Sequence, residues 1–426
     1  MQRIQDLPAE ELKKLYDAEL ARYDGFVSAG LSINMARGTP CPEQLDLSEE
    51  LLDIDMSPLH QCEDGDVRNY GILSGIPECR RLFAELCGVG PDNVIIGGCS
   101  SLQLMYDYVS QCVTKGPGVP GCAPWGEQNG VKFIAVVPGY DRHFGICEYL
   151  GIELVNVPIT PEGPDMDAVE ELIKDPSVKG MLCVPKYSNP DGVTYSAETV
   201  ERLAKMTPAA PDFRVIWDNA YCVHDLYGDG DELPNILDVA AKYGHEDNFV
   251  VFVSTSKISF PGAGVSAVAG SDANIRSILG RMKYQIISYD KINQLRHVIF
   301  FRNLDGITAH MKRHAEILRP KFETVLGTLD RELTWTGAAH WIKPRGGYFI
   351  SLYVDVGSAS RVGELCKKAG LTITRVGATY PYGKDPDDAN IRIAPSYPDC
   401  DTLKTAAELM CCCVRIAACE ELLARV

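Results

Sequence analysis

The chain has 426 residues, of which 46% are hydrophobic and 23% charged, a composition typical of a globular protein with more than one domain. Its formal net charge of −17 argues against nucleic-acid binding, because neutralising phosphates needs a basic face. An anionic substrate is compatible with this charge if the pocket carries its own arginines.

The ends and the cysteines give information about the compartment. The N-terminal segment, 1–8, has no apolar signal core, and no later apolar run is long enough to span a bilayer. The chain has 16 cysteines, but none are spaced as C-x-x-C, and the contiguous group 411–413 cannot all face one site on a helix. We interpret the cysteines as scattered thiols in a reducing compartment. These features predict a cytoplasmic protein without a membrane segment.

Apolar periodicity and the positions of glycine and proline predict the elements in chain order. A helix is expected over 8–29, an irregular stretch over 31–60 and a helix over 75–88. Strands are then predicted at 94–96, 133–137, 152–157, 180–185, 213–217, 249–253 and 264–269, with helices at 102–113 and 167–174. Short apolar strands separated by helices indicate an α/β fold, a three-layer sandwich around a mostly parallel sheet.

The pattern changes in the last third of the chain. Long helices are predicted over 274–330, followed by strand 347–353, helix 360–369, strand 390–394 and helix 401–424. This order predicts a smaller α+β domain. We therefore expect three parts: an N-terminal segment, 1–60, that joins the small domain; a large domain, 61–302; and a C-terminal small domain, 303–426.

Polar clusters follow three of the predicted strands. In chain order they contain Asn189, then Asp218 and Tyr221, then Ser254, Ser256 and Lys257. Ligands bind at the carboxyl ends of the strands in open α/β sheets, so these clusters should meet at one edge. A pyridine-aldehyde cofactor requires such a set: an amine to bond the aldehyde, a carboxylate for the ring nitrogen, and donors for the ring hydroxyl.

Each of these residues also has a simpler interpretation when it is taken alone. Asp218 would serve as a helix N-cap or loop residue, and most lysines are solvated surface groups. Lys257 differs because it follows an apolar strand that looks buried. Burial lowers the pKa of a lysine and frees its amine to act as nucleophile and base.

A glycine-rich turn, Gly97-Gly98-Cys99-Ser100-Ser101, joins a predicted strand to a predicted helix. Small residues allow the backbone to approach a ligand closely, and the helix start offers free N–H groups to an anion. The turn therefore indicates either a phosphate site or a serine N-cap after a glycine turn. The sequence of this segment alone leaves both interpretations open.

Two literal motif matches fail on their context. The segment Gly116–Gly121 fits G-x-G-x-x-G, but no strand precedes it and prolines interrupt it. His310 and His314 lie one helical turn apart, yet no glutamate follows His310 and no third ligand is evident. We interpret the two histidines as part of a helix face and predict no metal site.

Several segments recur together in one known family. They are Asp66–Gly71, Val137–Phe144, Gly163–Asp167, Trp217–Tyr221, Ser254–Lys257 and Gly346–Phe349. With the clusters above, they resemble the fold-type I pyridoxal-phosphate aminotransferases, and within these the bacterial aspartate aminotransferase subgroup typified by corynebacterial enzymes. The resemblance covers nearly the whole chain, and the joint pattern is highly specific.

The resemblance implies a role for each matching residue. Lys257, Asp218 and Tyr221 would be the catalytic residues: Lys257 would bond the cofactor and move the proton, and Asp218 would pair with the ring nitrogen. Asn189 and Tyr221 would bind the ring hydroxyl, and Tyr140 would stack on the ring.

The resemblance also assigns the phosphate and substrate sides. The phosphate would be held by Ser100, Ser101, Ser254 and Ser256. Tyr70 would reach the phosphate in the neighbouring subunit, which implies a homodimer. Arg392 would bind the substrate α-carboxylate bidentately, and Gly38 would line the substrate side.

The chain departs from the family at one position. Many members place an arginine eight residues after the lysine to bind phosphate, whereas this chain has Val265 there. Another cation, or hydroxyls with helix N–H groups, must serve instead. The group that would bind a second, distal carboxylate is also open, with Arg37, Arg142 and Lys283 as candidates.

Taken together, the sequence predicts a homodimeric, pyridoxal-phosphate-dependent aminotransferase. The expected reaction converts aspartate and 2-oxoglutarate to oxaloacetate and glutamate. Two alternatives within the cofactor class are an aminotransferase for another amino acid and a β-lyase on the same scaffold. An alternative of another class, a non-catalytic ligand-binding or regulatory protein, is disfavoured because the lysine is present.

Overall fold

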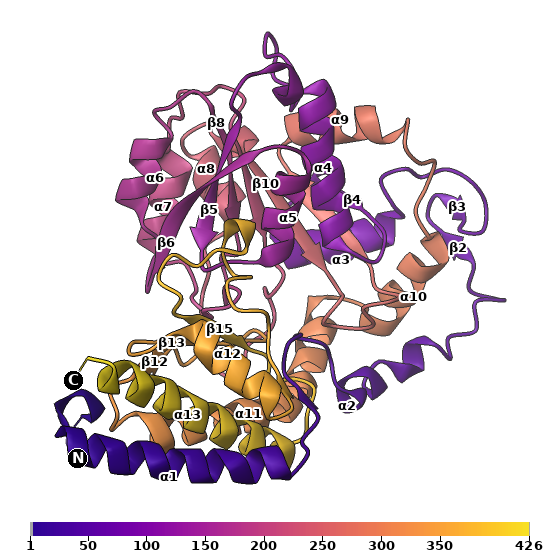
Figure 1. Ribbon diagram of the computed structural model, residues 1–426. Coiled ribbons are helices and arrows are strands. Elements are labelled where there is room, and N and C mark those ends of the chain that lie inside the picture. The colour runs from indigo at the N-terminus through magenta and orange to yellow at the C-terminus, as the bar shows by residue number, and fades with distance from the viewer. Residues whose placement is uncertain (1–2, 426) are drawn as a thin grey trace.

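The structure, a computed structural model, describes residues 3–425. Figure 1 shows a central sheet with helices on both faces and, below it, a second body of helices around a small sheet. The long N-terminal and C-terminal helices, α1 (Ala9–Ser28) and α13 (Cys400–Leu423), lie side by side in this lower body.

The central sheet has eight strands in the order β4-β11-β10-β9-β8-β5-β6-β7. Their bounds are β4 (Val94–Ile96), β5 (Lys132–Val137), β6 (Glu153–Thr160), β7 (Gly163–Pro164), β8 (Val178–Cys183), β9 (Arg214–Asp218), β10 (Phe249–Ser254) and β11 (Ser266–Gly270). All neighbours from β10 to β6 are parallel, β11 is antiparallel to both of its neighbours, and β7 pairs antiparallel to β6. The predicted, mostly parallel sheet is confirmed.

Alternate residues of the central strands enter two separate cores. In β9, Val215 and Trp217 belong to one apolar cluster and Ile216 to the other. In β10, Val251 and Phe252 divide in the same way. Successive side chains of a strand point to opposite faces, so the sheet has an apolar layer on each side. This burial on both faces explains why these strands read as continuous apolar runs.

Two groups of helices supply these layers. One face is covered by α4 (Ser101–Lys115), α5 (Asp141–Tyr149) and α9 (Asp272–Met282). The other face is covered by α3 (Pro77–Cys87), α6 (Met166–Leu172), α7 (Ala197–Lys205), α8 (Ile236–Ala241) and α10 (Lys291–Phe301). The three-layer sandwich is therefore confirmed, although the sequence reading had not identified the short helices α5, α7 and α8.

The lower body is built on a three-stranded antiparallel sheet with the order β12-β13-β15. Its elements are β12 (Ala339–Trp341), β13 (Ile350–Val354), β15 (Asn390–Ile393), α11 (Leu304–Leu333), α12 (Ala359–Lys368) and α13. Helix α1 packs on α13, and β1 (Ile33–Asn34) pairs in parallel with β14 (Leu371–Thr372). The N-terminal segment thus packs with C-terminal elements, while the proposed domain boundaries stay a prediction.

A buried ion cluster fixes α1 to its neighbours. Arg415 of α13 is 2% exposed and donates to both carboxylate oxygens of Glu19 at 2.8 and 3.0 Å. Glu332 of α11 pairs with Arg415 at 3.2 Å and with Arg22 at 2.9 Å. Pairing offsets the desolvation penalty of these buried charges, because each group keeps hydrogen-bond partners after leaving water.

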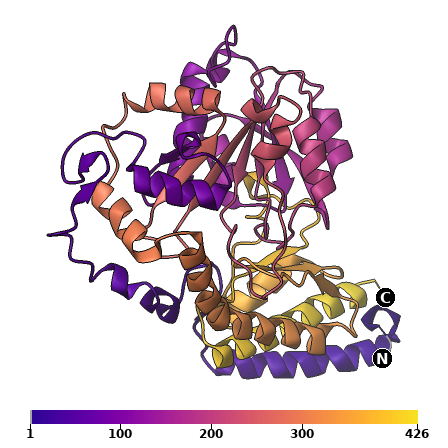
Figure 2. The ribbon, with the colours of Figure 1, turned by 180° about the vertical axis from the view of Figure 1, so that it is seen from behind.

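Helix α11 connects the two bodies, and Figure 2 shows it running from the sheet region down into the lower body. Ile307 and Met311 near its start pack with Leu82 and Ile258, whereas Leu329 lies in the core of the lower body. The remaining short elements are η1 (Ile4–Asp6), α2 (Pro42–Asp46), η2 (Glu49–Leu51), β2 (Gln61–Cys62), β3 (Gly65–Asp66), η3 (Pro91–Asn93), η4 (Trp125–Glu127), η5 (Glu246–Asn248) and η6 (Pro381–Gly383).

Two further findings concern the chain as a whole. Every cysteine within residues 3–425 is an unpaired thiol. Over the same range, none of the helices has the length and apolar character that crossing a bilayer requires.

Candidate active site

A cavity of about 540 Å³ opens where the carboxyl ends of the parallel strands face the lower body. Its lining includes every site residue that the sequence predicts except Tyr70: Gly38, Ser100, Ser101, Tyr140, Asn189, Asp218, Tyr221, Ser254, Ser256, Lys257 and Arg392. These residues come from both bodies and from strand ends far apart in the sequence. The volume is typical of a pocket for a small-molecule ligand.

Lys257 lies in the turn that follows β10. Its Nζ sits 5.2 Å from the centre of the Tyr221 ring and 5.7 Å from that of the Tyr348 ring. This amine makes no hydrogen bond or ion pair with any other residue of the range 3–425. Burial lowers the pKa of Lys257, against the opposing charge of Asp218. A lowered pKa leaves a larger fraction of the amine unprotonated and nucleophilic.

Asp218, the last residue of β9, is 3% exposed. Its Oδ2 lies 2.9 Å from Nε2 of His143, a residue of α5. Its Oδ1 is buried and has no hydrogen-bond partner among the described residues. A buried carboxylate oxygen without a donor lowers the stability of the fold. A ligand that donates an N–H to this oxygen would remove that penalty.

His143 is a site residue that the sequence reading did not single out. Its ring lies edge-on to the Tyr140 ring, with centroids 5.0 Å apart, and it is 2% exposed. The signal was present, because His143 follows Tyr140 by three residues within the segment 137–144 that carried the resemblance. No role was assigned to it because its contact with Asp218 joins positions 75 residues apart.

Two tyrosines of the pocket, the half-buried Tyr140 and the buried Tyr221, lie near the same carboxylate. Burial, followed by the nearby Asp218, raises the pKa of Tyr140 to about 12. Burial also raises the pKa of Tyr221 well above its ordinary value. Both phenols therefore stay protonated and can donate a hydrogen bond at neutral pH. Tyr221 stacks on Tyr348 with an interplanar angle of 22°.

Serine hydroxyls and a helix N-terminus gather at another part of the wall. Ser100 occupies the N-cap position of α4, but its side chain makes no capping hydrogen bond. Ser254 donates to Ser256 at 3.1 Å, and Ser256 donates to the carbonyl of Cys99 at 3.0 Å. The positive end of a helix with nearby hydroxyls suits an anion. Val265, at the position of the missing arginine, is 1% exposed and packs in the core.

Arg392 of β15 is 7% exposed and held on several sides. Nη1 donates to Asp141 at 3.0 Å and to Asn189 at 3.2 Å. Nε donates to Thr374 at 3.3 Å, and the guanidinium carbon lies 4.9 Å from the centre of the Phe349 ring. Nη2 donates to no other described residue, so it remains available to a ligand.

Gly38 lies against the Phe349 ring, and the same ring lies next to the Arg392 guanidinium. A Cβ atom at Gly38 would lie 2.7 Å from Cζ of Phe349, which is closer than a real contact allows. A larger residue would therefore displace the ring that packs beside Arg392. Gly38 therefore shapes the substrate side through Phe349.

Three exposed arginines complete the rim of the cavity: Arg37, Arg142 and Arg375. Their guanidinium groups form no hydrogen bond or ion pair with other residues in the described part of the chain. Arg375 was not among the sequence candidates, whereas Lys283, which was, does not line the cavity and lies over Tyr284. Thr374 donates to the carbonyl of Ala36 at 2.7 Å, which brings Arg37 and Arg375 close together in space.

The cavity has a charge opposite to that of the whole chain. Its cationic residues are Arg37, Arg142, Lys257, Arg375 and Arg392, and its acidic residues are Asp141 and Asp218. The chain carries a formal net charge of −17. A cationic pocket in an acidic protein attracts anionic ligands.

Tyr70 lies outside the cavity of its own chain. Its side chain is 82% exposed, and its backbone carbonyl accepts a hydrogen bond from the buried Lys291 at 3.3 Å. An aromatic ring exposed to this degree on an ordered segment is available to a partner. Its predicted contact with a neighbouring subunit stays a prediction.

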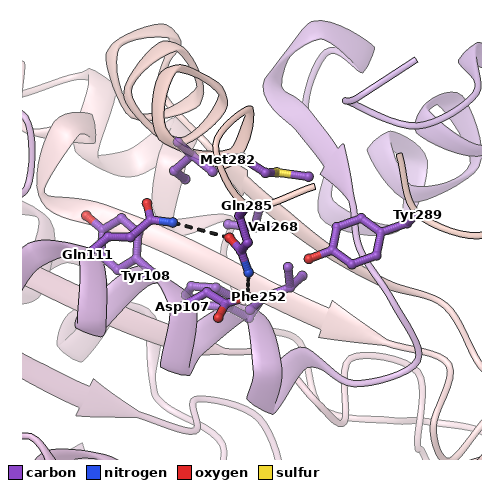
Figure 3. Close-up of a pocket in the computed structure, with 10 residues that line it drawn as sticks. Asp107, Tyr108, Gln111, Phe252, Val268, Met282, Gln285 and Tyr289 are labelled. Carbon is purple, nitrogen blue, oxygen red and sulfur yellow. Dashed lines mark hydrogen bonds between the residues drawn. The ribbon is translucent and has the colours of Figure 1, made fainter. Parts of the chain in front are cut away.

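A second cavity, between α4 and residues 282–289, is far smaller (Figure 3). It measures about 20 Å³, which is room for about one water. Gln285 donates to Asp107 at 2.6 Å at its edge. The residues 3–425 also contain no group of three side chains suited to hold a metal ion.

Comparisons with known proteins agree with this geometry. The family model for aspartate aminotransferase matches residues 7–425. An aspartate aminotransferase of Corynebacterium glutamicum is 44% identical over 421 residues, covering 98% of this chain and 96% of the relative. A putative aminotransferase of Mycolicibacterium smegmatis is 44% identical over 424 residues, covering 99% of both chains.

A crystal structure of an aspartate transaminase from Corynebacterium glutamicum superposes with a TM-score of 0.96 at 43% identity, covering 99% of both chains. Identity at this level over nearly the whole length establishes membership of a family. The resemblance predicted from the sequence is therefore confirmed. The chain belongs to the aspartate aminotransferase family.

Proposed function

We propose that this protein is a pyridoxal-phosphate-dependent aminotransferase that converts aspartate and 2-oxoglutarate to oxaloacetate and glutamate. One observation carries the proposal: the cavity contains both a buried carboxylate oxygen without a donor, on Asp218, and an amine without a hydrogen bond, on Lys257. A protonated ring nitrogen would satisfy the first group, and an aldehyde would bond the second. The 44% identity to an aspartate aminotransferase supports the choice of reaction.

The residues of the cavity fit this cofactor. Asp218 would accept the ring N–H, with its other oxygen held by His143. Tyr221 and Asn189 would bind the ring hydroxyl, and Tyr140 would stack on the ring. The phosphate would sit at the start of α4 among Ser100, Ser101, Ser254 and Ser256. The free Ser100 hydroxyl supports this phosphate site over a simple N-cap.

When bound, pyridoxal phosphate supplies an aldehyde that joins an amine and a protonated ring that withdraws electrons from the substrate's Cα–H bond. Asp218 keeps the ring nitrogen charged through its negative charge. Lys257 Nζ takes the proton from the substrate Cα, and its lowered pKa makes the amine a competent base. The rings of Tyr221 and Tyr348 confine this amine on one side.

The carboxylates of the substrate would form ion pairs with arginines of the cavity. Arg392 would bind the α-carboxylate through the free Nη2, and its contacts with Asp141 and Asn189 hold the guanidinium plane in place. A second carboxylate would lie near the rim arginines Arg37 and Arg142. A cationic cavity in an acidic chain supports a dicarboxylate substrate over a neutral amino acid.

A homodimer is part of this proposal. Tyr70 lies outside its own cavity with an exposed ring, so it would bind the phosphate of a partner subunit. Inactive variants Tyr70→Phe and Lys257→Ala, when mixed and allowed to exchange subunits, should then regain activity through hybrid dimers with one intact site. No recovery after verified exchange would count against a shared site.

A cytoplasmic location is also proposed. It is supported by the sixteen cysteines, none of which is paired within the described residues. Disulfides form in oxidising compartments and are rare in the cytosol.

The proposed activity is tested by borohydride reduction of the cofactor-loaded protein and peptide mapping, followed by half-reactions with a panel of amino acids. We expect the label on Lys257 and the fastest reaction with aspartate or glutamate. A label on another lysine would contradict the assignment of Lys257. Release of free ammonia together with pyruvate, without formation of the aminated cofactor, would indicate the β-lyase alternative.

A further inference from the structure

The turn that carries Lys257 leaves two carbonyls without a backbone partner. The N–H groups of Ile258 and Ser259 both donate to Thr255 O, at 2.9 and 2.8 Å. Within residues 3–425, no backbone N–H donates to the carbonyl of Lys257 or of Ile258. A buried carbonyl without a donor destabilises the fold, so side chains must supply the hydrogen bonds.

Two histidines from distant parts of the chain approach these carbonyls. His224, in the loop after β9, places Nε2 3.3 Å from Lys257 O. His310, on α11, places Nε2 2.8 Å from Ile258 O. A carbonyl only accepts hydrogen bonds, so Nε2 of His224 acts as a donor to Lys257 O. Nε2 of His310 contacts Ile258 O as one member of a histidine pair with His314. The two histidines are buried, at 3% and 6% exposure.

A third histidine, His297, contacts the same turn through the hydroxyl group of Ser259. Nδ1 of His297 on α10 lies 2.8 Å from Asn293 O and therefore donates, which leaves Nε2 as an acceptor. The Ser259 hydroxyl lies 2.8 Å from that Nε2 and donates to it. Three imidazoles from a loop and two helices thus contact successive residues of the Lys257 turn.

All three imidazoles are neutral. Burial lowers the pKa of His297 to about 4 and that of His310 below its ordinary value. Burial, followed by the charge of Lys257, lowers the pKa of His224 well below its ordinary value. Neutral rings donate or accept hydrogen bonds at the turn without placing another positive charge beside the amine.

A second row of contacts holds His310 in place. Nε2 of His314 lies 3.0 Å from Nε2 of His310, and the Ser48 hydroxyl lies 3.2 Å from the same atom. The amide of Gln44 lies between His314 Nδ1, at 3.0 Å, and the Tyr348 hydroxyl, at 2.8 Å. The histidine pair that failed as a metal motif is therefore part of a packed polar network behind the turn.

We propose that His224, His297 and His310 are positioning residues that hold the Lys257 turn so that the amine faces the cofactor; the proposal rests on the proposed function. Lys257 Nζ has no hydrogen bond of its own to a described residue, so its backbone turn sets its place. In the proposed function, the amine must reach the substrate Cα in the same geometry in every catalytic cycle. Small displacements of a reacting group cost large factors in rate.

The test compares His224→Leu, which removes the N–H donor, with His224→Gln, whose amide can donate to Lys257 O again. The rate at which Lys257 bonds added pyridoxal phosphate in the apoenzyme is followed by absorbance. The dissociation constant of pyridoxamine phosphate, which has no aldehyde and needs no bond to Lys257, is measured alongside. His224→Leu should bond the aldehyde about tenfold more slowly, as expected for one lost hydrogen bond. Pyridoxamine phosphate should bind as in the wild type, and His224→Gln should recover most of the rate.

His245→Leu is the matched control, because His245 Nδ1 lies 2.9 Å from Ala204 O, outside the cavity lining. It should leave the bonding rate unchanged. His310→Leu, which removes the ring in contact with Ile258 O, repeats the test from another element. Its result decides between the outcomes if His224→Leu does not fold. Wild-type bonding rates in the leucine variants, or an equal loss of pyridoxamine phosphate affinity, would overturn the proposal. A wild-type protein that bonds no cofactor at Lys257 would instead overturn the proposed function on which it rests.

Discussion

The inner wall of the cavity, around Lys257 and Asp218, and its outer rim, around the three exposed arginines, are built in opposite ways. At the inner wall, Asp218 is 3% exposed and held by His143, and the turn of Lys257 is fixed by three imidazoles. At the rim, Arg37, Arg142 and Arg375 are exposed, and their guanidinium groups form no hydrogen bond or ion pair with the described residues.

This contrast separates two tasks. Groups fixed in a buried environment are pre-organised, and their charges act strongly because water is excluded. Exposed arginines are screened by solvent and salt, so each contributes little but can adapt to a ligand. We therefore expect chemistry to depend on the inner wall and substrate selectivity to depend on the rim.

The largest effect is expected at Asp218. Asp218→Asn keeps the shape of the side chain but removes the charge that holds the ring nitrogen protonated. Opposite charges about 4 Å apart are worth about 4 kcal/mol at an effective dielectric of 20, or about a thousandfold in rate. The variant should keep its cofactor, measured by absorbance after dialysis, and lose kcat by about this factor.

Asp212→Asn provides a matched control for Asp218→Asn. Asp212 is also fully buried, but it pairs with Lys179 at 2.8 Å near the start of β9, outside the cavity lining. It should lower thermal stability and leave kcat unchanged. Near-normal turnover of Asp218→Asn would show that the carboxylate is only a structural residue at a strand end.

The second effect concerns Arg392, which joins the inner wall to the substrate. Arg392→Lys replaces a planar fork by a single ammonium and should weaken every amino-acid substrate alike. A lost charge-assisted contact costs about 1.5–3 kcal/mol, or about ten- to a hundredfold in kcat/KM. The losses for aspartate and alanine should be similar. A far larger loss for aspartate, with alanine spared, would show that Arg392 binds the distal carboxylate instead.

The same contrast explains how much of the site could be predicted from the sequence. Lys257 and Asp218 follow apolar runs, and such runs reveal buried strands, whose carboxyl ends must share an edge. That logic placed the three clusters in one cavity. The sequence pattern also identified the long elements, because an amphipathic or fully apolar period accumulates over many residues.

The supporting contacts could not be found in this way. His143 meets Asp218 across 75 residues, and His310 meets Ile258 across 52. Nothing in the local sequence of either histidine encodes its partner, because tertiary packing decides it. Arg375 was missed for the same reason: its neighbour Thr374 is hydrogen-bonded to Ala36, 338 residues away, and the sequence does not show this contact.

A smaller effect is expected at Gly38, where the inner wall meets the rim. The Cβ of Gly38→Ala would lie 2.7 Å from Phe349, whose ring lies beside the Arg392 guanidinium. Displacing a packed ring costs about 1–3 kcal/mol, so KM for amino acids should rise about tenfold with little change in cofactor affinity. Gly145→Ala on α5, where a Cβ meets no atom within 4 Å, should behave as the wild type. An unchanged KM in Gly38→Ala would show that Phe349 does not fix Arg392.

The smallest effects are expected at the rim. Arg37→Ala, Arg142→Ala and Arg375→Ala each remove one exposed charge, and exposed ion pairs are worth about 0.2–1 kcal/mol. Each change should therefore lower kcat/KM for aspartate by about 1.4- to fivefold, leave alanine unaffected, and matter less at high salt. Lys283→Ala is the control, because Lys283 does not line the cavity. A hundredfold loss of kcat/KM for aspartate in any one variant would contradict the distinction between the inner wall and the rim. It would show that this arginine becomes buried against the distal carboxylate when substrate is bound, so that selectivity too would depend on a pre-organised, desolvated contact.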